Sequence, residues 1–363
     1  MKILYAAYPF APVKEDTPGG AEQILLTLDK ASVKYGFDSA VLARADSQVS
    51  GRLYDIPVIE GEIDAAAKSL IYETLKKEII WALETEKPDL LHFHGFDFGE
   101  YLPMSGPPVL VTLHLPIDWY DKRHFNIARE GLHFNCVSYS QLQSGFNIAG
   151  NMNVISNGVP VEELSRGDEP KEDYAVYLGR ICWEKGTHLA IEAAQKAGIK
   201  LIIAGQVFNY FYHMEYYEKT VKPLIDGDKV KFIGPVNFNE KKKLLSGARC
   251  LLQPSLAAET SSLIAMEAIS CGTPVIAFKA GALPEIVSDG LTGFIVNDAD
   301  GMAEAIGKAD KINPENCKAA ALQRFSQDIM INNYISLYSR ILKQNTARKN
   351  KKEKMYLENK QGK

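Results

Sequence analysis

The stretch AETSSLIAMEAISCGTPVI, residues 258–276, contains two glutamates separated by seven residues and is followed by a β-branched strand. Thr260 or Ser261 is placed to cap a helix, and Gly272 and Pro274 are typical of its end. Glu259 then precedes the helix, and Glu267 lies within it among the apolar positions Leu263, Ile264, Met266 and Ile269. A carboxylate in apolar surroundings needs hydrogen-bond donors, which a ligand bearing hydroxyl groups would supply.

Short β-rich segments alternate with helical ones on both sides of this stretch. Such alternation predicts parallel sheets covered by helices on both faces. The first series is expected as strands in 2–8, 38–43, 89–94, 108–114, 133–138 and 152–156 with helices over 21–34 and 63–85. The second is expected as strands in 174–179, 199–205, 229–234, 250–253, 274–278 and 292–296 with helices over 187–197, 215–224 and 239–246. The sequence therefore predicts two successive doubly wound α/β units.

The segment 162–173 is polar, highly charged and contains Gly and Pro, so it is the expected linker. We expect domains at 1–161 and 162–327, a closing helix at 328–345 that packs back on the first domain, and a basic, disordered tail at 346–363. Contact of this tail with an anionic membrane surface is the weaker alternative, because the tail has few apolar residues to anchor it.

The composition excludes several classes of protein. A net charge of −4 gives no electrostatic argument for a nucleic-acid partner. The five cysteines are odd in number and scattered through apolar segments, which indicates reduced, buried thiols and a cytoplasmic location. No apolar stretch is long enough to span a bilayer, and Pro9 and Pro12 interrupt the opening segment, which favours a first strand over a signal peptide.

Candidate ligand-binding residues follow the first strand of each unit. Gly19 and Gly20 precede the first helix, where exposed backbone N–H groups can approach an anion, although a plain tight turn explains them equally well. Arg180 and Lys185 follow the first strand of the second unit, and ligands of doubly wound folds bind beyond the carboxyl ends of strands. Two cations at this position suit a diphosphate, whereas solvated surface charges are the alternative.

Three histidines lie at strand ends. His114 ends one strand and could contact a substrate hydroxyl, although a structural role is the commoner one for a single histidine. His92 and His94 alternate on the preceding strand and have no convincing third ligand for a metal, so we expect packing or hydrogen bonding. The aromatic segment 207–217 could stack a nucleobase, wall an acceptor site or cover the sheet edge.

Taken together, these segments resemble the family-4 glycosyltransferases of the GT-B fold. The resemblance rests on eight segments in the family's order: GGAEQ, KPDLLHFHG, PVLVTLHLP, VISNGV, YLGRICWEKGTHLAIEAA, KVKFIGPV, the stretch from Glu259 through AMEAISCGTPVIA, and GALPEIVSDGLTGFIV. It implies two Rossmann-like doubly wound domains that face each other across a cleft, where a nucleotide-sugar binds. It extends from Met1 to about Leu342.

The resemblance also implies roles for individual residues. Arg180 and Lys185 would neutralise the donor diphosphate and the leaving nucleotide. Backbone N–H groups of Ser261, Ser262, Leu263 and Ile264 would add to diphosphate binding. Glu259 would contact the hydroxyls of the donor hexose and Glu267 those of the ribose. His114 would lie beside the transferred sugar, and Gly19 and Gly20 near the diphosphate or the acceptor.

The implied reaction is transfer of a hexose-type sugar from a UDP- or GDP-sugar to an acceptor hydroxyl, with retention of configuration by a front-side route. No metal is expected, because two cations are available for charge neutralisation and no Asp-X-Asp motif ends a strand.

Where many relatives have Phe-Gly after the first glutamate, this chain has Thr260-Ser261-Ser262, and the identity of the donor sugar stays open. The acceptor is not indicated, and loops near Trp119, Tyr120 and Arg123 are candidates to shape its site. A nucleotide-sugar 2-epimerase and a non-catalytic nucleotide-sugar-binding protein are the alternatives.

Overall fold

The computed structural model describes residues 1–361 except 62, 146–150 and 168. The chain divides into two compact units. Unit 1 contains residues 1–137, 144–155 and 331–363, and unit 2 contains residues 138–143 and 156–330. The first expected boundary lay after residue 161, whereas the units divide after residue 155. Residues 362 and 363 of the expected tail and residue 168 of the expected linker lie outside the described residues.

Unit 1 is built on a parallel sheet of seven strands in the order β3-β2-β1-β4-β5-β6-β7. Its strands are β1 (Lys2–Ala6), β2 (Asp38–Arg44), β3 (Arg52–Ile56), β4 (Leu90–Phe93), β5 (Val109–Leu113), β6 (Leu132–Cys136) and β7 (Asn151–Val154). Its longer helices are α1 (Gly20–Lys34) and α2 (Ala65–Thr85). The Asp64 carboxylate caps the first turn of α2. The sequence analysis missed β3, which is short and carries Arg52 and an acidic residue, Asp55, in its five positions.

Unit 2 has a parallel sheet of six strands in the order β10-β9-β8-β11-β12-β13. The strands are β8 (Tyr174–Leu178), β9 (Lys200–Ala204), β10 (Val230–Gly234), β11 (Cys250–Gln253), β12 (Val275–Phe278) and β13 (Gly293–Val296). The helices are α3 (Tyr139–Ser144, of which Ser144 falls in unit 1), α4 (Val161–Leu164), α5 (Thr187–Ala197), α6 (Phe211–Tyr216), α7 (Phe238–Gly247), α8 (Leu263–Ser270), α9 (Leu283–Ile286), α10 (Ala299–Ile306) and α11 (Pro314–Arg324). Single-turn helices occur as well, among them Trp183–Lys185 between β8 and α5. The prediction of two doubly wound parallel sheets is confirmed.

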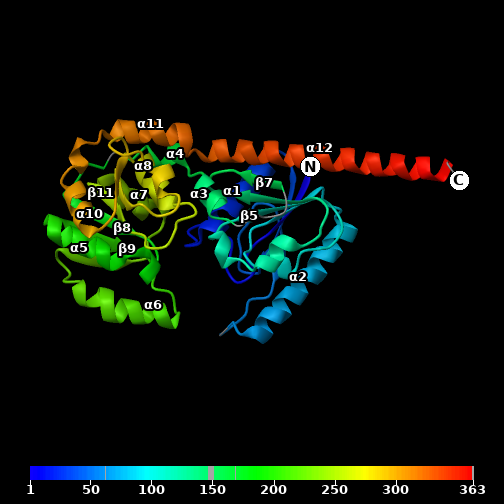
Figure 1. Cartoon of the computed structure of the whole chain (residues 1–363). Helices are drawn as coiled ribbons and strands as arrows, with labels where there is room; N and C mark the ends of the chain where they lie inside the picture. The colour runs from blue at the N-terminus through cyan, green and yellow to red at the C-terminus, as the bar shows by residue number, and fades with distance from the viewer. Residues whose placement is uncertain (62, 146–150, 168, 362–363) are drawn as a thin grey trace. The chain divides into compact units, whose positions relative to one another are not determined.

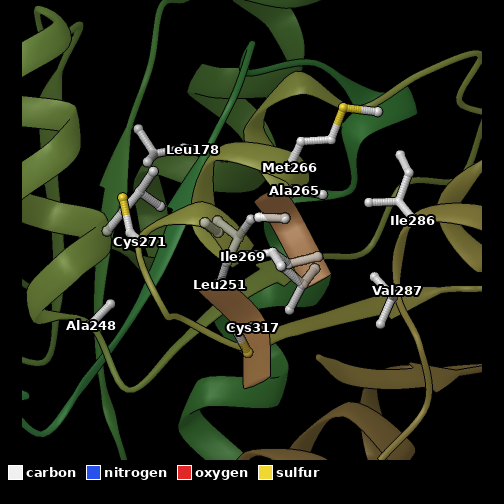
Figure 2. Close-up of a cluster of buried hydrophobic side chains, with 14 of the residues drawn as sticks. Leu178, Ala248, Leu251, Ala265, Met266, Ile269, Cys271, Ile286, Val287 and Cys317 are labelled. Carbon is white, nitrogen blue, oxygen red and sulfur yellow. The ribbon is translucent and has the colours of Figure 1, made fainter. Parts of the chain in front are cut away.

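Alternate residues of the unit 2 strands bury two separate cores. Ala175 and Cys250 pack with α5 and α10, whereas Val176 and Leu251 pack with α8 and α11 on the other face of the sheet (Figure 1). Figure 2 shows the second core, in which Ile269 of α8 lies close to Leu251 of β11. Because side chains alternate along a strand, a helix on each face is needed to bury both sets. Residues 258–276 therefore contribute Ala265, Met266, Ile269 and Val275 to this core.

Helix α12 (Gln327–Gln361) belongs to unit 1 from Ile331 onward. Its buried tyrosines complete a polar network under the sheet: the Tyr334 hydroxyl bonds Thr112 at 3.1 Å and Asn135 at 3.0 Å, and the Tyr338 hydroxyl lies 2.8 Å from His92 Nδ1. The helix also includes residues 346–361, where the sequence analysis predicted disorder. Lys, Arg, Glu and Gln are good helix formers, and Lys352 pairs with Glu130, so this charged segment continues the helix.

In the described part of the chain, no helix combines the length and the apolar character needed to cross a membrane. All five cysteines are unpaired and buried, as their apolar contexts predicted.

Candidate functional site

The candidate residues of unit 2 lie at the point where the strand order of its sheet reverses. β8 pairs with both β9 and β11, and the segments that leave β8 and β11 carry Arg180, Lys185 and Glu259. Since both strands are parallel, both segments emerge at the same edge of the sheet. This edge is where doubly wound folds bind ligands.

Lys185 and Glu259 form a partly buried ion pair at this edge. The ammonium group of Lys185 donates to Glu259 Oε1 at 2.5 Å, and the Ser255 hydroxyl donates to the same oxygen. The Glu259 side chain is only 9% exposed. The guanidinium of Arg180 is exposed in the same loop. The sequence analysis predicted both charges of the pair but not their contact.

Two glycines bring these segments together. Gly186 has φ +66°, and a Cβ there would lie 2.1 Å from the carbonyl oxygen of Pro254. Gly281 has φ +54°, and its Cβ would lie 2.2 Å from the carbonyl oxygen of Glu259. That carbonyl accepts a hydrogen bond from the Ala282 N–H at 2.7 Å. The backbone on both sides of the ion pair is therefore held by close contacts that only glycine allows.

The start of α8 offers donors beside this pair. Its N-cap is Ser262, whose hydroxyl oxygen accepts from the Ala265 N–H at 3.3 Å and bonds the Gln253 side chain. The prediction of Thr260 or Ser261 as the cap is wrong, because Gln253 at the end of β11 holds Ser262 in that position. The N–H groups of Leu263 and Ile264 open the first turn, where no intrahelical acceptor exists. The buried Ser261 hydroxyl has no partner among the described residues, so three donors are available to an anion.

Glu267 lies about one turn after the start of α8 and is 4% exposed. Lys241 of α7 donates to its Oε1 at 2.5 Å, and the same ammonium lies 5.5 Å from the centre of the Phe238 ring. The sequence analysis did not single out Lys241, because it begins a run of three lysines that is typical of a solvated helix face. The apolar surroundings predicted for Glu267 did indicate that its carboxylate needs a cation from another segment of the chain.

In unit 1, the strand order reverses between β1 and β4, and the predicted residues follow β1, β4 and β5. His94 Nδ1 and His114 Nε2 lie 2.9 Å apart, and the two rings stack with centroids 5.1 Å apart. The Tyr120 hydroxyl accepts from the backbone N–H of His114 at 2.8 Å, which fixes the loop after β5. Sequence reasoning missed His94 as the partner of His114, although both end neighbouring strands.

These imidazoles are held neutral. Burial lowers the pKa of His114 to about 3 and the pKa values of His92 and His94 well below their usual 6.5. A neutral pair shares one proton along its hydrogen bond, so one ring donates and the other accepts. His114 can therefore meet a ligand as a neutral donor or acceptor but not as a cation.

Gly19 caps α1, with Gly20 its first residue, and the Glu22 carboxylate folds over this helix start. A Cβ at Gly19 would lie 1.8 Å from Glu22 Oε2. Glu22 is 6% exposed, and burial raises its pKa. Because a carboxylate already lies at the glycine pair, a hydroxyl group fits there better than an anion.

The aromatic segment has no single role. The Phe211 side chain is 83% exposed, whereas Tyr216 is buried and its hydroxyl bonds the ring of His188 at 2.8 Å. The end of the segment therefore covers the sheet, and its exposed rings stay available to a ligand.

Comparisons with solved structures agree with the fold described above. A sucrose-phosphate synthase from Thermosynechococcus elongatus superposes on 94% of this chain and 99% of its own length, with a TM-score of 0.78 and 18% identity. Anabaena HepE, solved in complex with UDP-glucose, superposes on 94% of this chain and all of its own, with a TM-score of 0.72 and 20% identity. The chain has the GT-B fold, as the resemblance implied.

Residues 162–324 match the family model described as Glycosyl transferases group 1. A sulfoquinovosyl transferase of Arabidopsis thaliana is 30% identical over 268 residues, which is 62% of this chain and 50% of that protein. The chain spans about half the length of the curated relatives it matches. The matched segment lies within unit 2, and it contains Arg180, Lys185, Glu259 and Glu267.

Gly281→Ala should destabilise unit 2 more than Gly290→Ala. Both residues have positive φ, +54° and +72°, but only Gly281 is crowded, since nothing lies within 4 Å of a Cβ at Gly290. In Gly290→Ala, backbone strain should lower the free energy of unfolding by about 1 kcal/mol. In Gly281→Ala it should fall by at least about 2 kcal/mol more, because the close backbone contact with Glu259 must open. Urea unfolding measures both, and equal losses would show that this contact does not hold the Glu259 backbone.

The stability of unit 1 should fall as the pH is lowered from 7 to 5. The unfolded chain protonates these histidines near pH 6.5, whereas folded His114 stays neutral down to about pH 3, so the unfolded state binds more protons in this window. Each histidine contributes up to about 1.4 kcal/mol per pH unit. In His94→Gln, the free energy of unfolding, measured with urea at each pH, should fall less steeply as the pH is lowered. Parallel curves for wild type and variant would contradict a neutral buried His94.

Proposed function

We propose that this protein is a retaining glycosyltransferase that moves a hexose-type sugar from a nucleoside-diphosphate sugar to an acceptor hydroxyl. The observation that carries the proposal is the arrangement in unit 2, where the Lys185–Glu259 pair, the exposed Arg180 and the start of α8 follow neighbouring strand ends. This combination places cations and N–H donors for phosphate next to a carboxylate for sugar hydroxyls. The match of residues 162–324 to a glycosyl transferase family and the UDP-glucose bound by HepE support it.

In this proposal the diphosphate is held by charge and by hydrogen bonds. The guanidinium of Arg180 and the ammonium of Lys185 neutralise it, and the N–H groups of Leu263 and Ile264 with the Ser261 hydroxyl complete its shell. As the bond from the sugar to the phosphate breaks, negative charge grows on the leaving phosphate. Donors that are already in place stabilise this charge without reorganisation, which lowers the barrier.

The two glutamates are proposed to recognise hydroxyls. Glu259 keeps one carboxylate oxygen in the pair with Lys185 and offers the other to the donor hexose. Glu267 similarly accepts from the ribose hydroxyls while Lys241 balances its charge. Because Lys185 and Ser255 both engage Glu259 Oε1, this carboxylate is better suited to orient a sugar than to attack it. We therefore favour the front-side route, in which the leaving phosphate takes the proton of the acceptor hydroxyl, over a covalent glycosyl-enzyme.

From unit 1, His114 is proposed to contact the transferred sugar as a neutral ring, with His94 fixing which nitrogen carries the proton. Gly19, Gly20 and Glu22 are proposed to take the acceptor. The proposed reaction needs no divalent metal for charge neutralisation, and a cytoplasmic location is proposed from the reduced thiols. Donor sugar, nucleobase and acceptor stay open.

Arg180→Ala should lower kcat/KM about ten- to a hundredfold. Charge-assisted contacts to phosphate are worth about 1.5 to 3 kcal/mol each, and this one strengthens as the nucleotide leaves. The measurement is release of UDP or GDP from a panel of nucleotide-sugars, first without acceptor and then with candidate hydroxyl acceptors. Lys219→Ala is the matched control, because Lys219 is an exposed cation of the same unit paired only with Glu215 in the described structure. A change below about twofold for Arg180→Ala would remove this residue from the site.

The same assay separates the alternatives. An epimerase would convert the nucleotide-sugar without acceptor, and a binding protein would release no nucleotide. Product of inverted configuration would contradict the front-side route. Activity lost in a chelator and restored by Mg²⁺ or Mn²⁺ would contradict charge neutralisation by Arg180 and Lys185 alone.

A further inference from the structure

Three side chains able to coordinate a metal ion meet in unit 2, beside the loop that follows β8. They are Cys182, Glu184 and His213, and each offers one ligand atom within 4.8 Å of the other two. Cys182 and Glu184 lie on the segment that carries Arg180 and Lys185, whereas His213 belongs to α6, after the next strand. The cluster therefore joins two segments that are separate in the sequence.

Two of the three residues are buried, Glu184 is partly buried, and two polar atoms of the cluster lack partners among the described residues. Cys182 is fully buried, and His213 is 2% exposed. His213 Nδ1 and Glu184 Oε2 are both buried without a hydrogen-bond partner among the described residues. Burying such an atom destabilises the fold when the atom stays unpaired. A cation bound between them would satisfy both atoms at once.

The ligand types select the ion. A thiolate, an imidazole and a carboxylate form a set that suits Zn²⁺, whereas Mg²⁺ and Ca²⁺ prefer oxygen ligands. Three protein ligands leave the fourth tetrahedral position to water. Binding breaks the S–H bond of Cys182 and forms a sulfur–zinc bond, and the proton goes to solvent.

The charges of the filled cluster balance. Arg180 and Lys185 are the neighbouring cations whose charges act on the Cys182 thiol, and Arg180 acts on His213 as well. They would oppose an uncompensated metal ion. The Cys182 thiolate and the Glu184 carboxylate together carry two negative charges, so a bound divalent ion adds no net charge beside Arg180.

We propose that Cys182, Glu184 and His213 form a Zn²⁺ site that ties the loop bearing Arg180 and Lys185 to α6. The ion holds the loop in place, and neutralisation of a bound phosphate stays with the two side-chain cations. The proposal does not depend on the proposed function, since metal binding is measured without substrate.

The test uses the full-length, reduced protein after removal of metal with a chelator and desalting. Zn²⁺ affinity is measured by competition with a chromophoric chelator, and Co²⁺ is added as a spectroscopic probe. Wild type should bind one equivalent and show the thiolate-to-cobalt charge-transfer absorption. Cys182→Ser should lose this absorption, and both Cys182→Ser and His213→Gln should bind Zn²⁺ at least about tenfold more weakly.

Cys317→Ser is the matched control, because Cys317 is a buried thiol of the same unit outside the cluster. It should bind both metals as the wild type does. Far-ultraviolet circular dichroism shows whether each variant is folded, and His213→Gln tests the site if Cys182→Ser does not fold. Absence of the absorption in wild type, its survival in Cys182→Ser, or equal Zn²⁺ affinity in wild type and His213→Gln would overturn the proposal.

Discussion

The burial of two carboxylates on either side of one helix start is the constraint on which unit 2 depends. Glu259 and Glu267 are nearly removed from water, and each is balanced by a single lysine, Lys185 or Lys241. A carboxylate removed from water is costly unless it is paired and hydrogen-bonded, so removing either lysine would leave a buried charge uncompensated. These pairs therefore hold the loop after β8, the start of α8 and helix α7 in one arrangement before a ligand binds.

The same arrangement separates two kinds of recognition along a short stretch of chain. Cations and N–H donors gather between β8 and the start of α8, where they suit phosphate oxygens. Carboxylates flank this region, where they suit hydroxyl groups. Unit 1 differs in kind, because its buried His92 and His94 and its partly buried His114 are neutral. A polar, uncharged ring at the end of β5 can orient a hydroxyl without attracting an anion, whereas the charged candidate residues Arg180, Lys185, Glu259 and Glu267 all lie in unit 2.

Regular elements with strong periodicity could be predicted from the sequence, and local polar detail could not. The bounds of most strands follow from short apolar segments, and the start of α5 follows from Gly186, which caps it. Ser262 instead of Ser261 caps α8 because Gln253, nine residues away, bonds it. Lys241 meets Glu267 across 26 positions, a pairing that no local pattern reveals. The charged end of α12 was misjudged because low apolar content was weighed above helix propensity.

Central to the proposed function is Glu267, whose carboxylate is proposed to accept hydrogen bonds from the ribose hydroxyls of a nucleotide bound along α8. The most direct measurement is a double cycle: the dissociation constants of UDP and GDP and of their 2′,3′-dideoxy forms, for wild type and for Glu267→Gln. With wild type, removal of both hydroxyls should weaken binding of the preferred nucleotide at least about tenfold, as loss of a charge-assisted contact predicts. With Glu267→Gln the two forms should bind within a few fold of each other. An equal loss in both proteins would contradict the claim.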